Sequence, residues 1–452
     1  MENVSAVAAA SAGRLRRTLT LSDLILYGVI VVQPVAPMSV FGVLSDRSHG
    51  HVVTTILMAM VAMLFTAISY GRMARVYPSA GSAFTYVGQE INPALGYITG
   101  WGMVMDYLLN PLICTIWCSQ QAHVFAPHVP YWGWAIFFVL LFTGLNVRGV
   151  KTSARVNAGL ATGMGVVIAI FFVVAARYVF GHPHDGAAFF LQPFYDPKTW
   201  SSKAILGGTS IAVLTYIGFD GISTLSEEVE NPRRNILLAT VLTCLVIGIL
   251  SAIEVYAAQL IWPAWMPFPN VDTAFVHVAA RAWHPMLAIV GVTLLVANFG
   301  SAMGAQLGAA RLLYGMGRSE ALPKSFFGKV DPERHVPRNN VIFVGLIALI
   351  GAFIMSFGLG AQMLNFGALI AFMGVNAAAF IHYFVRAEEK KLTHFIPPVA
   401  GFCICLLLWV NLSHTAIFAG VTWMAIGISF GAWKTHGFRK NLINFELPPD
   451  EA

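Results

Sequence analysis

Long apolar runs separated by short polar segments recur along the chain from Leu24 to the region of Trp433. A helix needs about 20 mainly apolar residues to cross the roughly 30 Å hydrocarbon core of a bilayer, where helices and closed barrels alone satisfy their own backbone groups. We therefore predict an all-α membrane protein of about twelve transmembrane helices. The predicted spans are residues 24–45, 52–70, 94–126, 131–147, 157–180, 204–228, 236–262, 285–315, 339–357, 362–385, 394–411 and 414–433.

The composition of the 452-residue chain excludes a soluble globular domain. Hydrophobic residues make up 57% of the chain and charged residues 11%, whereas a soluble domain carries roughly 25% charged residues. The formal net charge is +6, but the basic residues are dispersed among apolar runs and form no continuous face for nucleic acid. The five cysteines show no paired spacing with histidines, so we predict no metal site.

Lysine and arginine are distributed unevenly between the two sides of the predicted spans. Because the number of spans is even, both termini lie on one side, and 21 of the 27 basic residues fall on that side against 5 on the other. Cytoplasmic loops carry the excess of Lys and Arg, so we predict that both termini are cytoplasmic. The chain then divides into an N-terminal segment, 1–23, one transmembrane domain, 24–433, and a C-terminal tail, 434–452.

The first span contains two closely spaced prolines, in the run Gln33-Pro34-Val35-Ala36-Pro37. Two missing backbone donors are expected to break the helix near the middle of the membrane. Broken helices mark transport sites, which makes Gln33, Pro34 and Val35 candidates for substrate binding. An ordinary proline kink is the alternative.

The sixth span shows a related interruption at residues 215–221, where two glycines flank a carboxylate. An unwound backbone at half depth exposes carbonyl groups for a cation, and Asp220 would stand at the start of the second half-helix. The substrate-binding candidates in this span are Tyr216, Gly218, Phe219 and Asp220. A glycine packing notch is the alternative for this break alone, but a matched pair of breaks in spans one and six favours a secondary transporter.

Three motifs lie at the ends of predicted spans. They are residues 70–86 with Asn92-Pro93 and Gly100-Trp101, residues 218–220 with Glu227-Glu228 and residues 231–236, and residues 310–318. Together they resemble the signatures of amino acid-polyamine-organocation permeases, and the likeness covers nearly the whole chain. It implies a LeuT-like fold in a bacterial inner membrane, with two inverted five-helix repeats plus two further helices. In that fold the substrate lies between broken helices one and six and is flanked by helices three and eight.

Four shorter motifs, at residues 65–71, 105–108, 224–228 and 365–369, are similar to those of bacterial putrescine importers within this family. Amino acid carriers of the family commonly have a Gly-x-Gly break in the first helix, whose amides hold the substrate carboxylate. The prolines of this chain cannot donate there, which favours a substrate without an α-carboxylate or one held in another manner. Ser39 stands where the importer pattern has an aspartate, and this departure keeps amino acids in contention.

Five carboxylates fall within or at the ends of predicted spans: Asp106, Asp220, Glu227, Glu228 and Glu254. A charge at mid-depth costs about 2.5–3.5 kcal/mol on insertion scales, so these acids indicate a negative centre suited to an ammonium group or a proton. Asp220 is predicted to contact the amine or carry a proton, or else to cap the half-helix. Glu227 and Glu228 are predicted to form an inner gate or proton relay, or else to pair with interfacial arginines. Glu254 is predicted to serve in a relay, or else to be a packed or snorkelling side chain.

Other polar and aromatic side chains complete the candidate site. Asp106 and Tyr107 lie on the third helix, and Asp106 is a substrate-binding candidate as one of the acids within the spans. The family likeness makes Tyr107 a candidate to line the site by packing and a cation–π contact, with ordinary aromatic packing as the alternative. Asn298 and Ser301 in the eighth span are predicted to bind the substrate or a coupling ion, or else to hydrogen-bond a neighbouring helix.

These observations predict a secondary active transporter that moves a small amine-bearing solute by alternating access, with putrescine uptake as the leading function. An amino acid permease or exchanger is the alternative, and a transporter-like receptor without flux is a third possibility. No reactive constellation for an enzyme is visible. The expected partners are a polyamine or amino acid and the lipid bilayer, with no nucleic acid and an oligomeric state that the sequence does not specify.

The sequence predicts no cofactor and leaves the driving force open between a proton gradient, a sodium gradient and exchange. Many family members that use protons have a lysine in the fifth helix in place of a sodium ion. Residues 158–175 of this chain contain no lysine.

Overall fold

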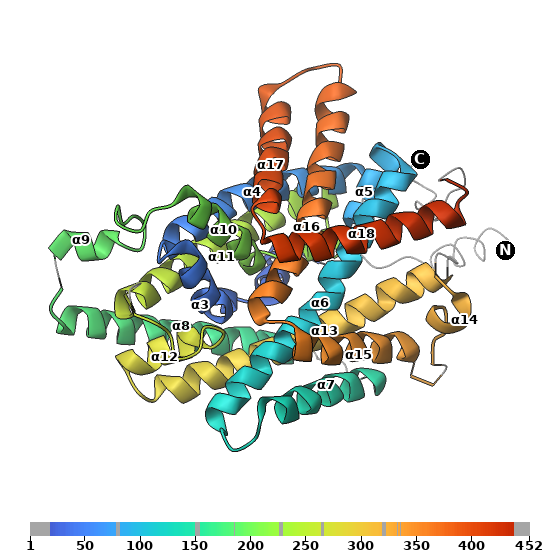
Figure 1. The fold of residues 1–452 in the computed structure, drawn as a ribbon. Helices are drawn as coiled ribbons and strands as arrows, with labels where there is room; N and C mark the ends of the chain where they lie inside the picture. Colours follow the sequence, from blue (N-terminus) through green and yellow to red (C-terminus); the bar gives the residue numbers. More distant parts are fainter. Residues whose placement is uncertain are drawn as a thin grey trace, which may run out of the picture.

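The computed structural model of the chain describes residues 19–77, 82–149, 154–184, 186–225, 229–263, 266–318, 322–331, 333–334 and 336–437. In these residues the regular secondary structure is helical, apart from one isolated β-bridge between Leu19 and Val229. The predicted all-α class is confirmed. Figure 1 shows the long helices arranged around α6 (Pro93–Phe125), which crosses the centre of the molecule.

The membrane spans follow the predicted order. Eight helices of the described chain are long and apolar enough to cross a membrane, and one bent pair gives a ninth span. The shorter apolar helices α7 and α15 and the 33-residue α6 bring the total to about twelve. In chain order the spans are α2 (Leu21–Val32) with α3 (Ala36–Ser48), α4 (Val52–Val76), α6, α7 (Tyr131–Val147), α8 (Ala154–Gly181), α10 (Ser202–Ala212) with η1 (Val213–Thr215) and η2 (Phe219–Leu225), α11 (Pro232–Ile261), α13 (Met286–Arg318), α15 (Arg338–Ile354), α16 (Phe357–Phe380) with η3 (Ile381–Val385), α17 (Leu392–Val410) and α18 (His414–Lys434).

Four short helices lie between the spans and are absent from the sequence prediction. They are α5 (Ser82–Glu90), α9 (Gly186–Leu191), α12 (Ala274–Ala282) and α14 (Lys324–Phe327). None of them is long enough to cross a bilayer, so a search for apolar runs of about 20 residues passes over them. Of the four, α5 packs against α6, α16 and η2, which places it beside the sixth span.

Polar residues at the helix starts explain where several spans begin. Thr20 and Asp23 form a capping box at the start of α2, in which the Thr20 backbone N–H donates to Asp23 Oδ2 at 2.9 Å. Asn92 caps α6, whose first residue is Pro93, and Ser413 caps α18. These caps satisfy N–H groups that a lipid environment would leave unpaired.

Both predicted helix breaks are present. Span one is interrupted between α2 and α3, and the two parts are bent by 46°. Gln33, the residue that ends α2, has a φ of 65°. Span six leaves α-helical geometry after Ala212, and Gly218 adopts a φ of 117°, which favours glycine because a Cβ is strained there. The breaks therefore fall where the prolines and glycines of the sequence predicted them.

Two glycines bring the third and tenth spans into close contact. A Cβ on Gly367 of α16 would lie 2.4 Å from the carbonyl oxygen of Gly102 on α6. Small residues permit such an approach of helix backbones. Because α13 also packs against α6, the third span is held between the eighth and tenth spans.

Several contacts join the ends of different spans. Glu230 donates its backbone N–H to Leu19 O at 2.9 Å, beside the bridge between Leu19 and Val229. Arg72 Nη1 at the end of α4 donates to Thr393 O at the start of α17, also at 2.9 Å. These contacts join the end of span six to the start of span one, and the end of span two to the start of span eleven.

Candidate functional site

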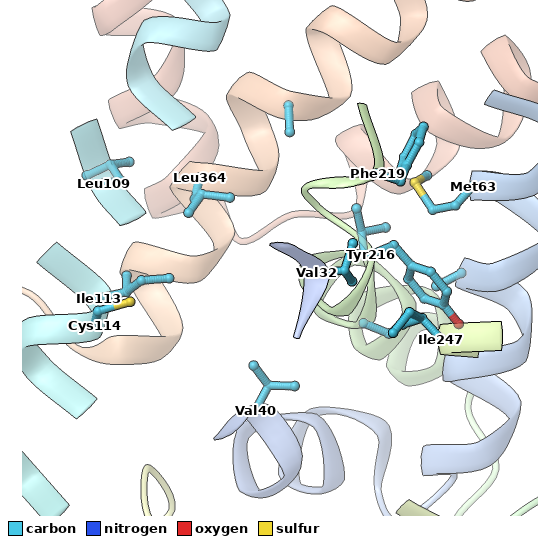
Figure 2. Packing of buried hydrophobic residues seen from close by; sticks show 14 of the residues in the cluster. Val32, Val40, Met63, Leu109, Ile113, Cys114, Tyr216, Phe219, Ile247 and Leu364 are labelled. Atoms are coloured by element: carbon cyan, nitrogen blue, oxygen red, sulfur yellow. The ribbon is translucent and has the colours of Figure 1, made fainter. Parts of the chain in front are cut away.

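The two helix breaks lie against each other. A Cβ placed on Gly218 would lie 3.0 Å from the side chain of Val31 and 3.5 Å from its backbone. In the same way, Gly28 of α2 faces Ile222 of η2. Figure 2 shows Val32, at the end of α2, near Tyr216 of the second break. The unwound segments of spans one and six thus form one region of the molecule.

Most of the backbone donors at the break in span one are absent or already used. Two of its residues are prolines and carry no N–H. The Ala36 N–H donates to Gln33 O at 3.0 Å, and the Met38 N–H donates to Val35 O at 3.1 Å. Helix N-termini commonly bind anions through such N–H groups. This helix start offers fewer of them to a substrate carboxylate.

The Gln33 side chain holds the break against the eighth span. Its Nε2 donates to Ala297 O of α13 at 2.8 Å. Pro34 and Val35 are buried beside it. These three predicted site residues therefore fix the geometry of the break, and the Gln33 amide donates to the protein in this conformation.

The break in span six places Asp220 in the first turn of η2. Its Oδ1 accepts a hydrogen bond from the Gly218 N–H at 3.2 Å, and its carbonyl accepts one from Ser223 Oγ at 2.6 Å. The Gly218 amide is therefore already bonded to the carboxylate of Asp220, which remains partly exposed.

Asp106 on α6 and Asp220 lie close enough for their charges to interact. Both carboxylates are partly exposed, and no lysine, arginine or histidine in the described residues forms an ion pair with either. The phenol of Tyr107 interacts with both, and its ring lies against Gly308 of α13. The structure thus brings together Asp106, Tyr107 and Asp220 as an acidic centre between the third, sixth and eighth spans.

Tyr70 of α4 is a candidate site residue that sequence reasoning missed. It is fully buried, its hydroxyl has no hydrogen-bond partner in the described chain, and it interacts electrostatically with Asp106 and Asp220. Tyr70 opens the motif at residues 70–86, which was the available signal. Its ring packs edge-on against Phe219 at 5.6 Å and Phe372 at 5.9 Å between centroids.

Two aromatic candidates of span six point into the protein core. Phe219 is fully buried and packs against Tyr70 and Phe372. Tyr216 is 1% exposed, and its hydroxyl donates to Ile56 O of α4 at 2.9 Å. Figure 2 shows both side chains directed toward the helix that carries Met63. In this conformation both side chains are buried in contacts with other parts of the protein.

The polar candidates of the eighth span connect it to its neighbours. Asn298 Nδ2 donates to Ser39 Oγ of α3 at 3.1 Å. Ser301 Oγ donates to Asn110 Oδ1 of α6 at 3.2 Å. Together with the Gln33 contact to Ala297, these bonds tie one stretch of α13 to both α3 and α6. They follow the alternative that such residues bond a neighbouring helix.

A buried carboxylate beneath the site joins α5 to the end of the tenth span. Glu90 is 1% exposed and accepts hydrogen bonds from Tyr77 Oη (2.9 Å), His382 Nδ1 (2.8 Å) and Arg386 Nη1 (2.7 Å). Burial, followed by the hydrogen bond to Glu90 and its charge, raises the pKa of Tyr77 to about 12. The four side chains, which we call the Glu90 cluster, connect elements that lie far apart in the sequence.

The predicted gate or relay, Glu227 and Glu228, lies outside the described residues. Within the described ranges, no group of three or more His, Cys, Asp and Glu side chains is arranged to hold a metal ion. A cavity of about 310 Å³ opens beside α3 and α16, with Asp46, Arg47 and Gln362 in its lining. It does not include the acidic centre.

Residues 38–445 match the model of the amino acid permease family. The low-affinity putrescine importer of Escherichia coli K12 is 35% identical over 445 residues, which cover 96% of each chain. The methylthioribose transporter of Bacillus subtilis is 26% identical over 446 residues, covering 91% of this chain and 92% of the relative. The branched-chain amino acid permease of Bacillus subtilis is 25% identical over 460 residues, covering 94% and 95%.

Proposed function

Because this chain belongs to the amino acid permease family, we propose that it takes up a small amine-bearing solute, with putrescine as the leading substrate. The chain is a multi-pass inner-membrane transporter and not an enzyme, and it has the LeuT-like fold of its family. Transporters of this fold bind their substrate near mid-membrane between discontinuous helices and move it by alternating access.

The acidic centre is the observation that carries the proposal. Asp106 and Asp220 interact with each other and have no basic partner in the described chain. Two carboxylates in one region suit a substrate with two ammonium groups. One ammonium at about 4 Å from a carboxylate gains about 4 kcal/mol at an effective dielectric constant of about 20. The Escherichia coli relative is named as a putrescine importer, which agrees with a diamine.

The amide groups at the breaks argue against a substrate carboxylate. At span one the prolines carry no N–H, and the Ala36 and Met38 N–H groups are bonded to the carbonyl groups three residues earlier. This leaves the Val35 N–H without a backbone acceptor in the described chain. At span six the Gly218 amide donates to Asp220. An amino acid would therefore place its carboxylate near two acids, with few N–H donors at the breaks to offset the repulsion, which is unfavourable.

We assign different roles to the candidate residues. Asp220 and Asp106 bind the amines, and Tyr107 and Tyr70 line the site and face the acids. The remaining candidates hold the breaks and their surrounding helices in place: Gln33, Pro34, Val35, Tyr216, Gly218, Phe219, Asn298 and Ser301.

An amino acid permease or exchanger is the second candidate. Ser39 is the observation that favours it, because the side chain at this position in α3 is a neutral hydroxyl bonded to Asn298 and adds no third acid. The name of the branched-chain amino acid permease among the relatives agrees with this alternative.

Competition for uptake tests the proposal. Unlabelled putrescine and cadaverine should inhibit uptake of labelled putrescine at concentrations at which leucine and glutamate do not. Counterflow in proteoliposomes should show exchange of labelled putrescine, which a receptor without flux cannot perform. Strong competition by an amino acid, with none by diamines, would reject the diamine and leave the permease family standing.

The side of the membrane and the division of the chain follow from the charge distribution. We infer that both termini face the cytoplasm, since 21 of the 27 Lys and Arg residues fall on their side. Residues 24–433 then form the permease domain, between cytoplasmic segments 1–23 and 434–452.

A further inference from the structure

Glu254 is a buried carboxyl group that the proposed substrate site does not use. It is 0% exposed, and neither carboxyl oxygen has a hydrogen-bond partner among the described residues. It lies in the seventh span, about 10 Å along α11 from the helix end at Ile261. Complete burial excludes the snorkelling alternative for this side chain.

The position of Glu254 along α11 lies between contacts with both broken spans. On one side, a Cβ on Gly248 would lie 3.0 Å from the hydroxyl of Tyr216 at the break of span six. On the other side, Gln259 Oε1 accepts a hydrogen bond from Ser45 Oγ of α3, the second half of span one, at 3.0 Å. Both broken spans therefore contact α11 within about 9 Å of Glu254 along the helix axis.

Among the described residues, no charged group compensates Glu254. The elements packed against α11 are α2, α3, α4, α8, α12 and η2. The titratable groups on these elements and on α11, where side chains are described, are Asp23, Tyr27, Asp46, Arg47, Tyr70, Arg72, Arg75, Arg177, Tyr178, His277, Arg281, Asp220, Arg233, Arg234, Cys244 and Tyr256. None of these groups has a charge interaction with the Glu254 carboxyl group.

We propose that Glu254 binds the proton whose gradient drives uptake. An isolated ionised carboxylate is so costly in apolar surroundings that the group takes up a proton instead. Glu254 therefore carries a proton in this conformation, and a conformation that admits water to it lets the proton leave. Proton binding and conformation are then linked, because each state of the group favours one arrangement of the spans.

This inference rests on the proposed uptake function and adds its coupling ion. The proton enters from the outer side, binds the Glu254 carboxylate, and leaves to the inner side after the substrate. A glutamine at this position imitates the protonated acid permanently. It should allow the conformational cycle of exchange while removing the response to a proton gradient.

Accumulation in proteoliposomes tests the proposal. The probe is labelled putrescine, with a gradient of one pH unit, acid outside, and the membrane potential held at zero by valinomycin and potassium. With one proton per substrate, wild-type protein should accumulate putrescine about tenfold. Glu254→Gln should keep counterflow but reach a ratio of only about one. Glu389→Gln, the same chemical change at an exposed position, should accumulate like wild type.

Several results would overturn the assignment. It fails if Glu254→Gln accumulates putrescine like wild type, or if wild-type accumulation does not respond to the pH gradient. If Glu254→Gln also loses counterflow, Glu254→Asp is the deciding variant, because it retains an acid at this position. Glu254→Asp should then accumulate putrescine in response to the pH gradient, and a variant that does not would reject proton binding by Glu254.

A spectroscopic measurement separates this inference from the substrate assignment. Infrared spectra of purified wild-type protein near neutral pH should contain a protonated carboxyl band that Glu254→Gln lacks, whatever the substrate is. Identical carboxyl bands in the two proteins would reject the proposal. If wild type transports leucine and not putrescine, the diamine assignment fails, and the same gradient experiment with labelled leucine still tests Glu254.

Discussion

The close approach of α6 and α16 predicts the effect of one added methyl group. A Cβ on Gly367 would lie 2.4 Å from Gly102 O and 3.4 Å from the Asp106 N–H nitrogen. Weak C–H···O contacts have C···O distances of about 3.3–3.6 Å, so Gly367→Ala requires the helices to separate by roughly 1 Å. The atoms contacted belong to the backbone of α6, so no side chain can turn away. Overpacking of this kind costs about 1–3 kcal/mol.

The displacement should also affect transport, because Asp106 follows Gly102 by one helical turn. We expect Gly367→Ala to lower the unfolding temperature in detergent and to raise the KM for putrescine. Gly144→Ala on α7 is the matched control, since a Cβ there meets nothing within 4 Å. That control should be neutral or stabilise by up to about 1 kcal/mol. Normal stability and uptake in Gly367→Ala would show that the close approach of α6 and α16 does not constrain the position of Asp106.

Three further predictions concern other parts of the molecule. Glu90→Gln weakens the hydrogen-bond acceptor of the Glu90 cluster and should destabilise the protein by about 1 kcal/mol. The value is low because the Arg386 side chain is 58% exposed. An unchanged thermal unfolding curve would show that the cluster contributes nothing to stability. Tyr70→Phe removes a buried, unpartnered hydroxyl group beside Asp106 and Asp220. The variant should keep its stability but bind putrescine about tenfold more weakly. Equal affinity of the variant and wild type in a binding titration would remove Tyr70 from the site. Cysteine introduced at Ser5 should resist a membrane-impermeant thiol reagent in intact cells, and its labelling there would reverse the orientation.

Local chemistry explains which features could be predicted from the sequence. The span limits follow from continuous apolar runs, and the breaks follow from Pro34, Pro37 and Gly218, whose effects on a helix do not depend on distant partners. Asp220 was identified because it adjoins a break. These signals are contained in a few consecutive residues.

Features that depend on distant contacts could not be predicted in this way. The Gln33 amide donates to Ala297, which is 264 residues away, and Glu90 pairs with Arg386, which is 296 residues away. No pattern near Gln33 or Glu90 specifies these partners. The same holds for Glu254, since periodicity places it in an apolar helix but does not tell whether its carboxyl group finds a donor.

Ligand-dependent stability of purified protein tests whether an acidic centre at the two breaks binds a diamine. A ligand at 100 times its dissociation constant adds about 2.7 kcal/mol of stability. We expect putrescine to raise the unfolding temperature of wild-type protein and leucine to leave it unchanged. Asp220→Asn should abolish the putrescine effect while the variant remains folded. Stabilisation of wild type by leucine but not putrescine, or equal stabilisation of Asp220→Asn by putrescine, would contradict diamine binding at the acidic centre.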